Sequence, residues 1–181
     1  YQTDCLMMEG VSISFLAEKE KPGVYYSEKE LQEALKEVIK EHPKNMLVFN
    51  GYKANPKRFL GFSEVSPRLT VFNSETAALL KELFGKDEHY YYLPGEKTQQ
   101  GLDPSYEISY DSLLNEPEKY FWQVTNFSDL PPETIYIHSD AEPLGDFDPA
   151  YALFLADLKK RQIQFLPMSC SGHAVPEDLK K

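Results

Sequence analysis

Residues 46–85 read MLVFNGYKANPKRFLGFSEVSPRLTVFNSETAALLKELFG, and this stretch decides the fold. Its two apolar runs, 46–50 and 69–72, have the length and composition of buried strands. A short helix is expected between them, over residues 56–62. A second helix is expected after the second run, from the N-cap Ser74 to the closing Gly85. Strand and helix therefore alternate, which predicts a parallel sheet covered by helices.

The same alternation continues along the rest of the chain. Ser27 and Glu30 have the spacing of a capping box, and the helix that they start should end before Pro43. Residues 94–118 are rich in turn formers and predict a loop or a small excursion. Strands are expected at 4–9, 90–93, 120–124, 134–137 and 163–168, and a helix at 148–160. The sequence thus predicts an α/β fold with three layers, a mostly parallel sheet with helices on both faces.

Composition describes an ordinary globular protein. The chain has 181 residues, 41% of them hydrophobic and 27% charged, which is enough for one substantial core. It contains no apolar run long enough for a membrane span and no secretory signal peptide. Two cysteines, Cys5 and Cys170, are too few for a disulfide framework and are expected as small core residues. We therefore expect a cytoplasmic protein with no membrane partner.

The charge is uneven. A net charge of −10 argues against non-specific affinity for nucleic acid over the whole surface. Residues 43–70 nevertheless hold five basic side chains and one acidic side chain: Lys44, Lys53, Lys57, Arg58, Arg68 and Glu64. A basic patch there could guide a phosphate chain, with Lys53, Lys57 and Arg58 as candidate phosphate-binding residues. The alternative is a solvated helix face with ordinary lysines.

Three strands end in small or polar residues. Residues 165–174 read FLPMSCSGHA, residues 133–143 read ETIYIHSDAEP, and residues 4–10 read DCLMMEG. Backbone N–H groups in such a loop, beside a helix start, suit an oxyanion or a phosphate. For the loop around His173 the alternative is a plain strand-to-helix turn with a solvated imidazole.

Together these strand ends resemble the β-CASP family of metallo-β-lactamase-fold nucleases, of the ribonuclease J and cleavage-factor type. Glu9 is similar to the acidic residue of the family's Glu-Gly or Glu-Ser strand end. The Ser-x-x-Glu-Pro loop is matched by Ser139, Glu142 and Pro143. The Ser-Gly-His-Ala loop is matched by Ser171, Gly172, His173 and Ala174. The resemblance covers nearly the whole chain and is strongest at its two ends.

The resemblance implies a zinc-dependent hydrolase that cleaves phosphodiester bonds, as a nuclease or exonuclease in RNA processing, although the family also includes members that act on DNA. It implies that His173 donates a proton to the leaving oxygen and that Glu9 orients or charges this imidazole. Ser171 and Gly172 would hold phosphate oxygens, and Ser139 and Glu142 would line the cap side of the same cleft. Some relatives carry a histidine where this chain has Ser169, so the grip on the substrate is expected to differ.

The family's His-x-His-x-Asp-His metal motif is absent, and the four histidines, at 42, 89, 138 and 173, are scattered. The resemblance therefore implies a fragment of a longer enzyme. Its parts would be a residual strand of the metallo-β-lactamase domain (1–15), a β-CASP-like domain (16–168) and a return segment (169–181). Zinc and the nucleic acid partner are expected in the parent protein, whereas no metal ligand and no activity are expected in this chain alone.

A competing hypothesis comes from another class of protein. The chain could be a non-catalytic α/β domain for ligand binding or scaffolding, with its Glu-Pro and Gly-His loops as ordinary turns. It has no Gly-x-Gly-x-x-Gly or Walker loop to support a standard nucleotide-binding domain. A homo-oligomer is compatible with the strand edges that a separated fragment would expose.

Overall fold

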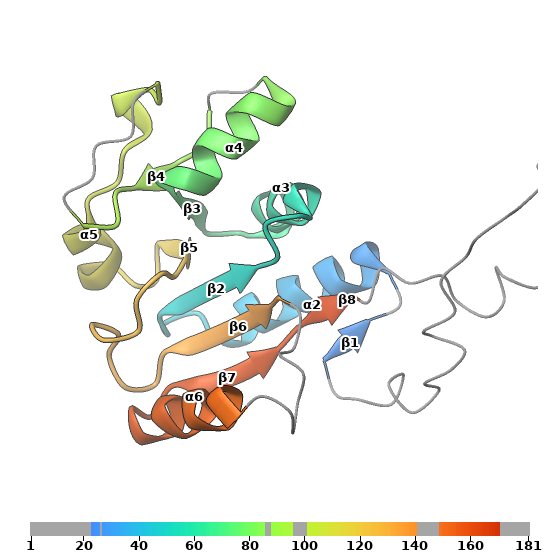
Figure 1. The fold of residues 1–181 in the computed structure, drawn as a ribbon, viewed down its shortest axis with the longest axis vertical. Coiled ribbons are helices and arrows are strands. Elements are labelled where there is room, and N and C mark those ends of the chain that lie inside the picture. Colours follow the sequence, from blue (N-terminus) through green and yellow to red (C-terminus); the bar gives the residue numbers. More distant parts are fainter. Residues whose placement is uncertain (1–22, 26, 86–87, 96–100, 141–148, 171–181) are drawn as a thin grey trace, which may run out of the picture.

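A computed structural model describes residues 23–25, 27–85, 88–95, 101–140 and 149–170. Within these ranges the molecule is built around a six-stranded sheet with helices above and below it (Figure 1). The strand order is β4-β3-β5-β2-β6-β7, and every neighbouring pair is parallel. The strands are β2 (Leu47–Gly51), β3 (Leu69–Asn73), β4 (Tyr91–Tyr92), β5 (Tyr120–Gln123), β6 (Ile135–Ser139) and β7 (Gln164–Pro167).

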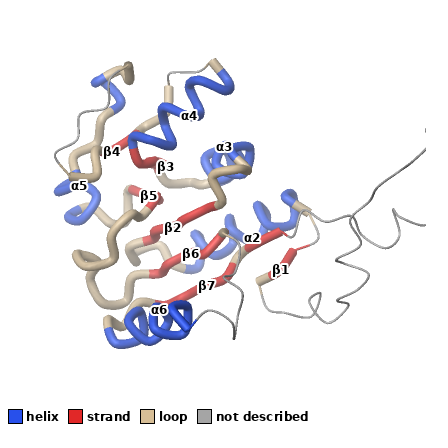
Figure 2. The backbone as a smooth tube through the Cα atoms, viewed as in Figure 1, coloured by secondary structure: helices blue, strands red, loops and turns tan. Residues whose placement is uncertain are grey.

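Helices cover both faces of the sheet, as Figure 2 shows. On one face pack α2 (Glu28–Glu41), α3 (Pro56–Val65) and α4 (Ser74–Phe84). On the other face pack α5 (Tyr110–Asn115) and α6 (Pro149–Lys160). The prediction of a three-layer α/β fold is confirmed, and in the described residues the main sheet is wholly parallel.

The strands alternate between the two layers of the core. In β2, Leu47 and Phe49 face the α2–α4 side, whereas Val48 between them faces the α5–α6 side. Phe49 lies at the centre of an aromatic cluster, with ring centroids 4.5 Å from Phe121 and 5.5 Å from Phe62. Strands buried on both faces explain why the sequence shows continuous apolar runs rather than alternation.

The helix ends follow local rules. Ser27 caps α2 by accepting a hydrogen bond from the Glu30 N–H at 3.2 Å, as its sequence spacing predicts. Gly85 closes α4 in the left-handed conformation, with φ of 69°. The N-cap of α4 is Asn73 and not Ser74 as expected, because the Asn73 side chain accepts from the Thr76 N–H at 2.8 Å.

Four elements were not expected from the sequence. A two-residue strand β1 (Val24–Tyr25) pairs in parallel with β8 (Ser169–Cys170), forming a small second sheet. A short 3-10 turn (Pro104–Tyr106) and α5 lie in the stretch expected to be a loop. The expected strand at 4–9 and Cys5 lie outside the described residues, and Cys170 is half-buried.

Candidate functional site at the carboxyl edge of the sheet

A cavity of about 640 Å³ opens where the central strands end. Ligands of open parallel sheets gather at this edge, where neighbouring strands connect to opposite sides. The wall contains strand ends from β2, β3 and β5 together with the first turn of α4. The lining residues are Asn50, Gly51, Tyr52, Lys53, Asn73, Ser74, Glu75, Pro94, Gln123, Val124, Thr125 and Asp140.

Three carboxamide side chains mark these strand ends. The oxygen of Asn50 accepts from the Ser139 N–H at 3.2 Å, and the oxygen of Gln123 accepts from the Asn73 N–H at 3.2 Å. Asn73 uses its oxygen to cap α4. Sequence reasoning missed all three, although a signal exists. Each polar amide ends an apolar run, twice as Val-Phe-Asn and once as Phe-Trp-Gln.

Arg58 joins two of the predicted loops. Its guanidinium donates to the Ser139 carbonyl through Nη1 at 3.1 Å and to the Cys170 carbonyl through Nη2 at 3.0 Å. Nε and Nη2 also bind the Glu28 carboxylate, with a shortest distance of 2.7 Å. Ser139 begins the Ser-x-x-Glu-Pro loop, and Cys170 directly precedes the Ser-Gly-His-Ala loop. The two loops therefore start from one shared anchor.

Ser139 lies fully buried at this anchor. Its main chain is bonded on both sides, to Asn50 and to Arg58, whereas its hydroxyl oxygen has no partner among the described residues. A buried hydroxyl usually has a hydrogen-bond partner, so this oxygen is available to a group beyond those residues. Glu9, Glu142, Ser171, Gly172 and His173 themselves lie outside the described residues.

The predicted basic patch needs a correction. Arg58 is only 6% exposed, and its guanidinium is already bound within the protein. Arg68 is also buried and donates to the carbonyls of His42, Asn45 and Pro117. Burial lowers the pKa of Arg68. Both arginines hold the fold together and do not form a surface for phosphate.

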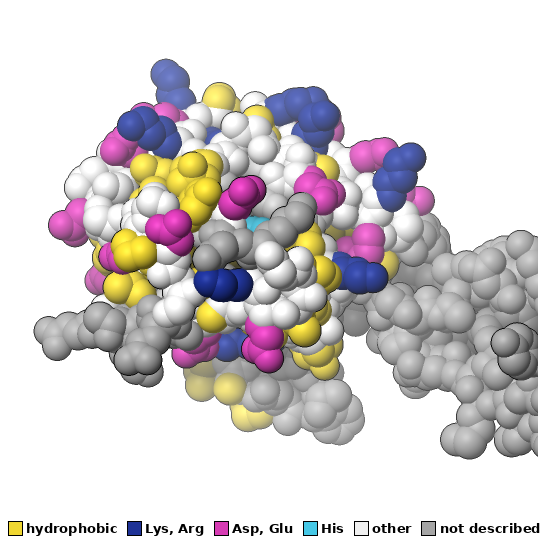
Figure 3. Space-filling model, turned by 90° about the horizontal axis from the view of Figure 1, so that it is seen from above, with side chains coloured by type: hydrophobic (Ala, Val, Ile, Leu, Met, Phe, Trp, Pro, Cys, Tyr) yellow, Lys and Arg dark blue, Asp and Glu magenta, His cyan; other side chains and the backbone are white. Residues whose placement is uncertain are grey.

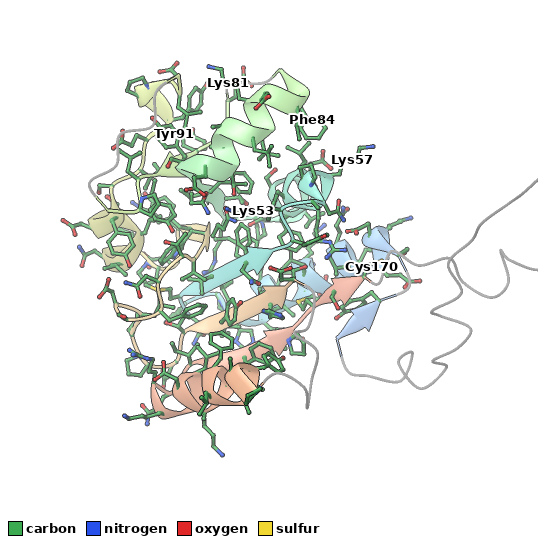
Figure 4. All side chains as sticks on the ribbon, viewed as in Figure 1. Lys53, Lys57, Lys81, Phe84, Tyr91 and Cys170 are labelled. Carbon is green, nitrogen blue, oxygen red and sulfur yellow. The ribbon has the colours of Figure 1, made fainter. Side chains whose placement is uncertain are left out.

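The two lysines remain at the surface (Figure 4). Lys53 lines the cavity and pairs with Glu75 at 3.0 Å, while Lys57 on α3 is exposed and is not part of the cavity wall. Figure 3 shows acidic and basic side chains interspersed over one face, without one large basic area. For Lys57, the alternative of an ordinary solvated lysine fits better than membership of a phosphate-binding patch.

The neighbouring tyrosines belong mostly to the core. Tyr91 and Tyr92 are buried, and the Tyr92 hydroxyl donates to the Gln123 carbonyl at 2.8 Å. Burial raises the pKa of Tyr92 to about 12. Base stacking on Tyr91 or Tyr92 is therefore ruled out by their position. Tyr52, which is 53% exposed at the cavity, offers an accessible ring instead.

Within the described ranges, no three histidine, cysteine, aspartate or glutamate side chains lie close enough together to hold a metal ion. In that same part of the chain, no helix has both the length and the apolar character needed to cross a membrane.

Comparison with known proteins gives one informative likeness. No protein-family model matches the chain, and no curated protein matches it. The chain is similar to a crystal structure of a protein of unknown function from Enterococcus faecalis V583, with a TM-score of 0.87 and 47% sequence identity. The likeness covers 96% of this chain and 41% of that protein's chain. This chain thus spans about two fifths of the length of its solved relative.

Proposed function

We propose that this chain is the β-CASP-like part of a zinc-dependent metallo-β-lactamase-fold hydrolase that cleaves phosphodiester bonds in RNA. The observation that carries the proposal is the Arg58 anchor. One guanidinium binds the residue that opens the Ser-x-x-Glu-Pro loop and the residue before the Ser-Gly-His-Ala loop. The resemblance requires these two loops to act on one phosphate, and a common anchor is what such joint action needs.

The greater length of the solved relative also supports the proposal. A protein of which this chain spans 41% has room for a second domain that carries the metal. The described residues offer no group of metal ligands. In the proposed enzyme, residues outside the described ranges would hold the zinc, and the metal would supply activation of the attacking water.

The chain's own contribution is to grip the phosphate and to deliver a proton. Ser139, with its buried hydroxyl, stands beside the anchor, and Ser171 and Gly172 follow Cys170 directly in sequence. His173 then donates a proton to the leaving oxygen, and Glu9 stabilises the protonated imidazole. Arg58 is a positioning residue here because it binds main-chain carbonyls and not the substrate.

A nuclease assay on the whole protein tests the proposal. With a 5′-labelled RNA oligonucleotide and added zinc, His173→Ala should lower kcat by about two to four orders of magnitude with little change in KM. His42→Ala is the matched control, since its carbonyl bond to Arg68 survives the substitution. An RNA that stays intact with the unmodified, zinc-loaded protein would refute the proposal.

Elemental analysis gives a second test. The whole protein should contain zinc, whereas this 181-residue chain purified alone should hold no stoichiometric zinc, because too few ligands are at hand. One tightly bound zinc per isolated chain would contradict the assignment as a cap segment.

The alternative, a non-catalytic ligand-binding domain, is favoured by one observation: the cavity is present in this chain by itself. On that hypothesis the whole protein binds a small molecule there, and His173→Ala changes nothing that can be measured in an assay of RNA cleavage.

A further inference from the structure

The cavity at the carboxyl edge presents a row of fixed hydrogen-bond donors. Asn50, Asn73 and Gln123 each have their carboxamide oxygen tied to a main-chain N–H. This fixes the amide NH₂ group as the outward end of each side chain. Among the described residues, the hydrogen bonds of these three side chains run through the oxygen and not through the NH₂ group. Asn73 and Gln123 are each only 4% exposed, so the cavity is where a partner can reach them.

The three amides come from adjacent strands at nearly the same level. The order β3-β5-β2 places the strands side by side, and Phe49, just before Asn50, pairs with Gln123. At about 4.8 Å between strands, the row is about 10 Å long. That length exceeds a single phosphate group and suits a ligand with several acceptor atoms along it.

The rest of the wall carries one basic side chain, Lys53, two acidic side chains, Glu75 and Asp140, and an exposed aromatic ring. Lys53 lines the cavity, and its pair with Glu75 is well exposed, so the ammonium group can be shared with a bound anion at little cost. The first turn of α4, at Ser74, adds the positive end of a helix dipole. Tyr52 on the same wall exposes its ring, which a nucleobase can stack upon.

We propose that this cavity binds one nucleotide, with its phosphate and sugar oxygens on the amide row, Lys53 and the start of α4, and its base on Tyr52. A volume of about 640 Å³ lies within the usual range for small-molecule sites. The choice of a nucleotide over another phosphate ester rests on the function proposed above. The cavity and its donors are observed independently of that function. A free mononucleotide and one unit of a single strand present the same chemistry to this wall.

Isothermal titration of the whole protein with adenosine 5′-monophosphate tests the site. This probe contains no phosphodiester bond, so binding is measured independently of cleavage. It should bind at least about tenfold more tightly than adenosine or inorganic phosphate, because each of these lacks one half of the contacts. No heat of binding at millimolar concentrations would overturn the proposal, as would equal affinity for inorganic phosphate.

Asn73→Asp is the sharpest variant. The aspartate oxygen still caps α4, while the donor NH₂ becomes a negatively charged acceptor. Affinity for the monophosphate should fall about tenfold or more. Asn126→Asp adds the same charge to an exposed residue outside the cavity wall, where the oxygen still accepts from Ser128, and should leave affinity unchanged. Equal losses in the two variants would overturn the proposal.

Lys53→Ala and Lys57→Ala form a second matched pair that does not touch the core. Both remove one exposed positive charge, and only Lys53 lines the cavity. Loss of affinity in Lys53→Ala alone is expected. An unchanged affinity in Lys53→Ala would overturn the site.

A short oligoribonucleotide separates the two sources of the nucleotide. Tighter binding than the monophosphate assigns the site to a strand, and equal binding assigns it to a free nucleotide. Both results support the site. Binding of the monophosphate without RNA cleavage would refute only the proposed function, and cleavage without binding of the monophosphate would refute only this inference.

Discussion

At the scale of single residues, Arg58 does more for this fold than its charge suggests. Arg58 forms an ion pair with Glu28. Among the ion pairs within the described ranges, it is the only basic side chain that is buried, since the other basic partners are at least one third exposed. Its planar fork reaches a carboxylate and two main-chain carbonyls that are far apart in the sequence. A lysine has its three donors on a single nitrogen, so it cannot reach the same spread of acceptors as this planar fork.

Arg58→Ala should lower the free energy of unfolding by about 3 kcal/mol, because it leaves two carbonyls and a half-buried carboxylate without their donor. Urea denaturation measures the loss. Arg58→Lys should recover only part of it. Glu28→Gln, which keeps an acceptor oxygen, should cost about 1 kcal/mol. Similar losses in Arg58→Ala and Glu28→Gln would show that the two carbonyl contacts are unimportant.

Tyr92 predicts how stability responds to alkali. Its pKa is raised to about 12 by burial, against an ordinary 10 in the unfolded chain. The folded protein therefore holds this proton where the unfolded chain has lost it. The stabilisation is complete below pH 10 and is lost as the pH rises from 10 to 12, by about 2–3 kcal/mol.

Tyr92→Phe should flatten this alkaline loss and should cost about 1 kcal/mol at neutral pH, through the lost bonds to Gln123 and Thr125. Denaturation midpoints between pH 8 and pH 12 follow both effects. Tyr120→Phe is a control at another buried tyrosine of the same core layer. An alkaline loss that is as steep in Tyr92→Phe as in the unmodified protein would contradict the prediction.

At the scale of elements, α4 connects stability and ligand binding. Asn73 starts the helix and lines the cavity, and Gly85 ends it far from the cavity. A Cβ on Gly85 would meet no atom within 4 Å, so a substitution there changes only the backbone strain at φ of 69°.

Gly85→Ala should therefore destabilise the protein by about 1 kcal/mol without affecting the ligand. Gly85→Asn should lose less, since asparagine tolerates this conformation. Thermal denaturation compares the two variants. If Gly85→Ala were as stable as the unmodified protein, the left-handed end of α4 would not be needed.

Most elements were predictable because each carries its own local signal. The runs 46–50 and 69–72 are strands by composition, and Ser27 and Gly85 mark helix ends by type. The misses depend on distant partners. β1 and β8 are two residues each and exist only through pairing with one another, and α5 is a six-residue helix in a polar stretch.

The site was less predictable for the same reason. The burial of Arg58 depends on Glu28, thirty residues earlier in the chain. One signal was available: Arg58 shares a helical face with Phe62 and Val65, which indicates an inward side chain. For Arg68, which lies between Pro67 and the first residue of β3, the sequence offers no comparable signal.

At the scale of the whole molecule, charge limits any binding of nucleic acid. The net charge of −10 repels a polyanion, and the burial of Arg58 and Arg68 leaves Lys53 and Lys57 as the exposed cations near the cavity from the predicted patch. Each phosphate contact contributes about 0.7 to the salt slope for single strands.

Binding of a labelled single strand to this chain should therefore be weak, with a salt slope of about −1.4 and not the steeper slope of four contacts. Fluorescence anisotropy at several salt concentrations measures it. Lys53→Glu with Lys57→Glu should abolish the binding without unfolding the protein. Tight binding that ignores both salt and this double variant would point to stacking as the dominant force.

The pairing of β1 with β8 has a consequence for the history of such proteins. The first and last described strands lie next to each other, so the chain enters and leaves the main sheet at adjacent points. A domain whose two ends are adjacent can be inserted into a single surface turn of another protein with little change to the rest of that protein. Such a domain can be gained, lost or exchanged as a unit, and its sequence can diverge separately from that of the protein around it.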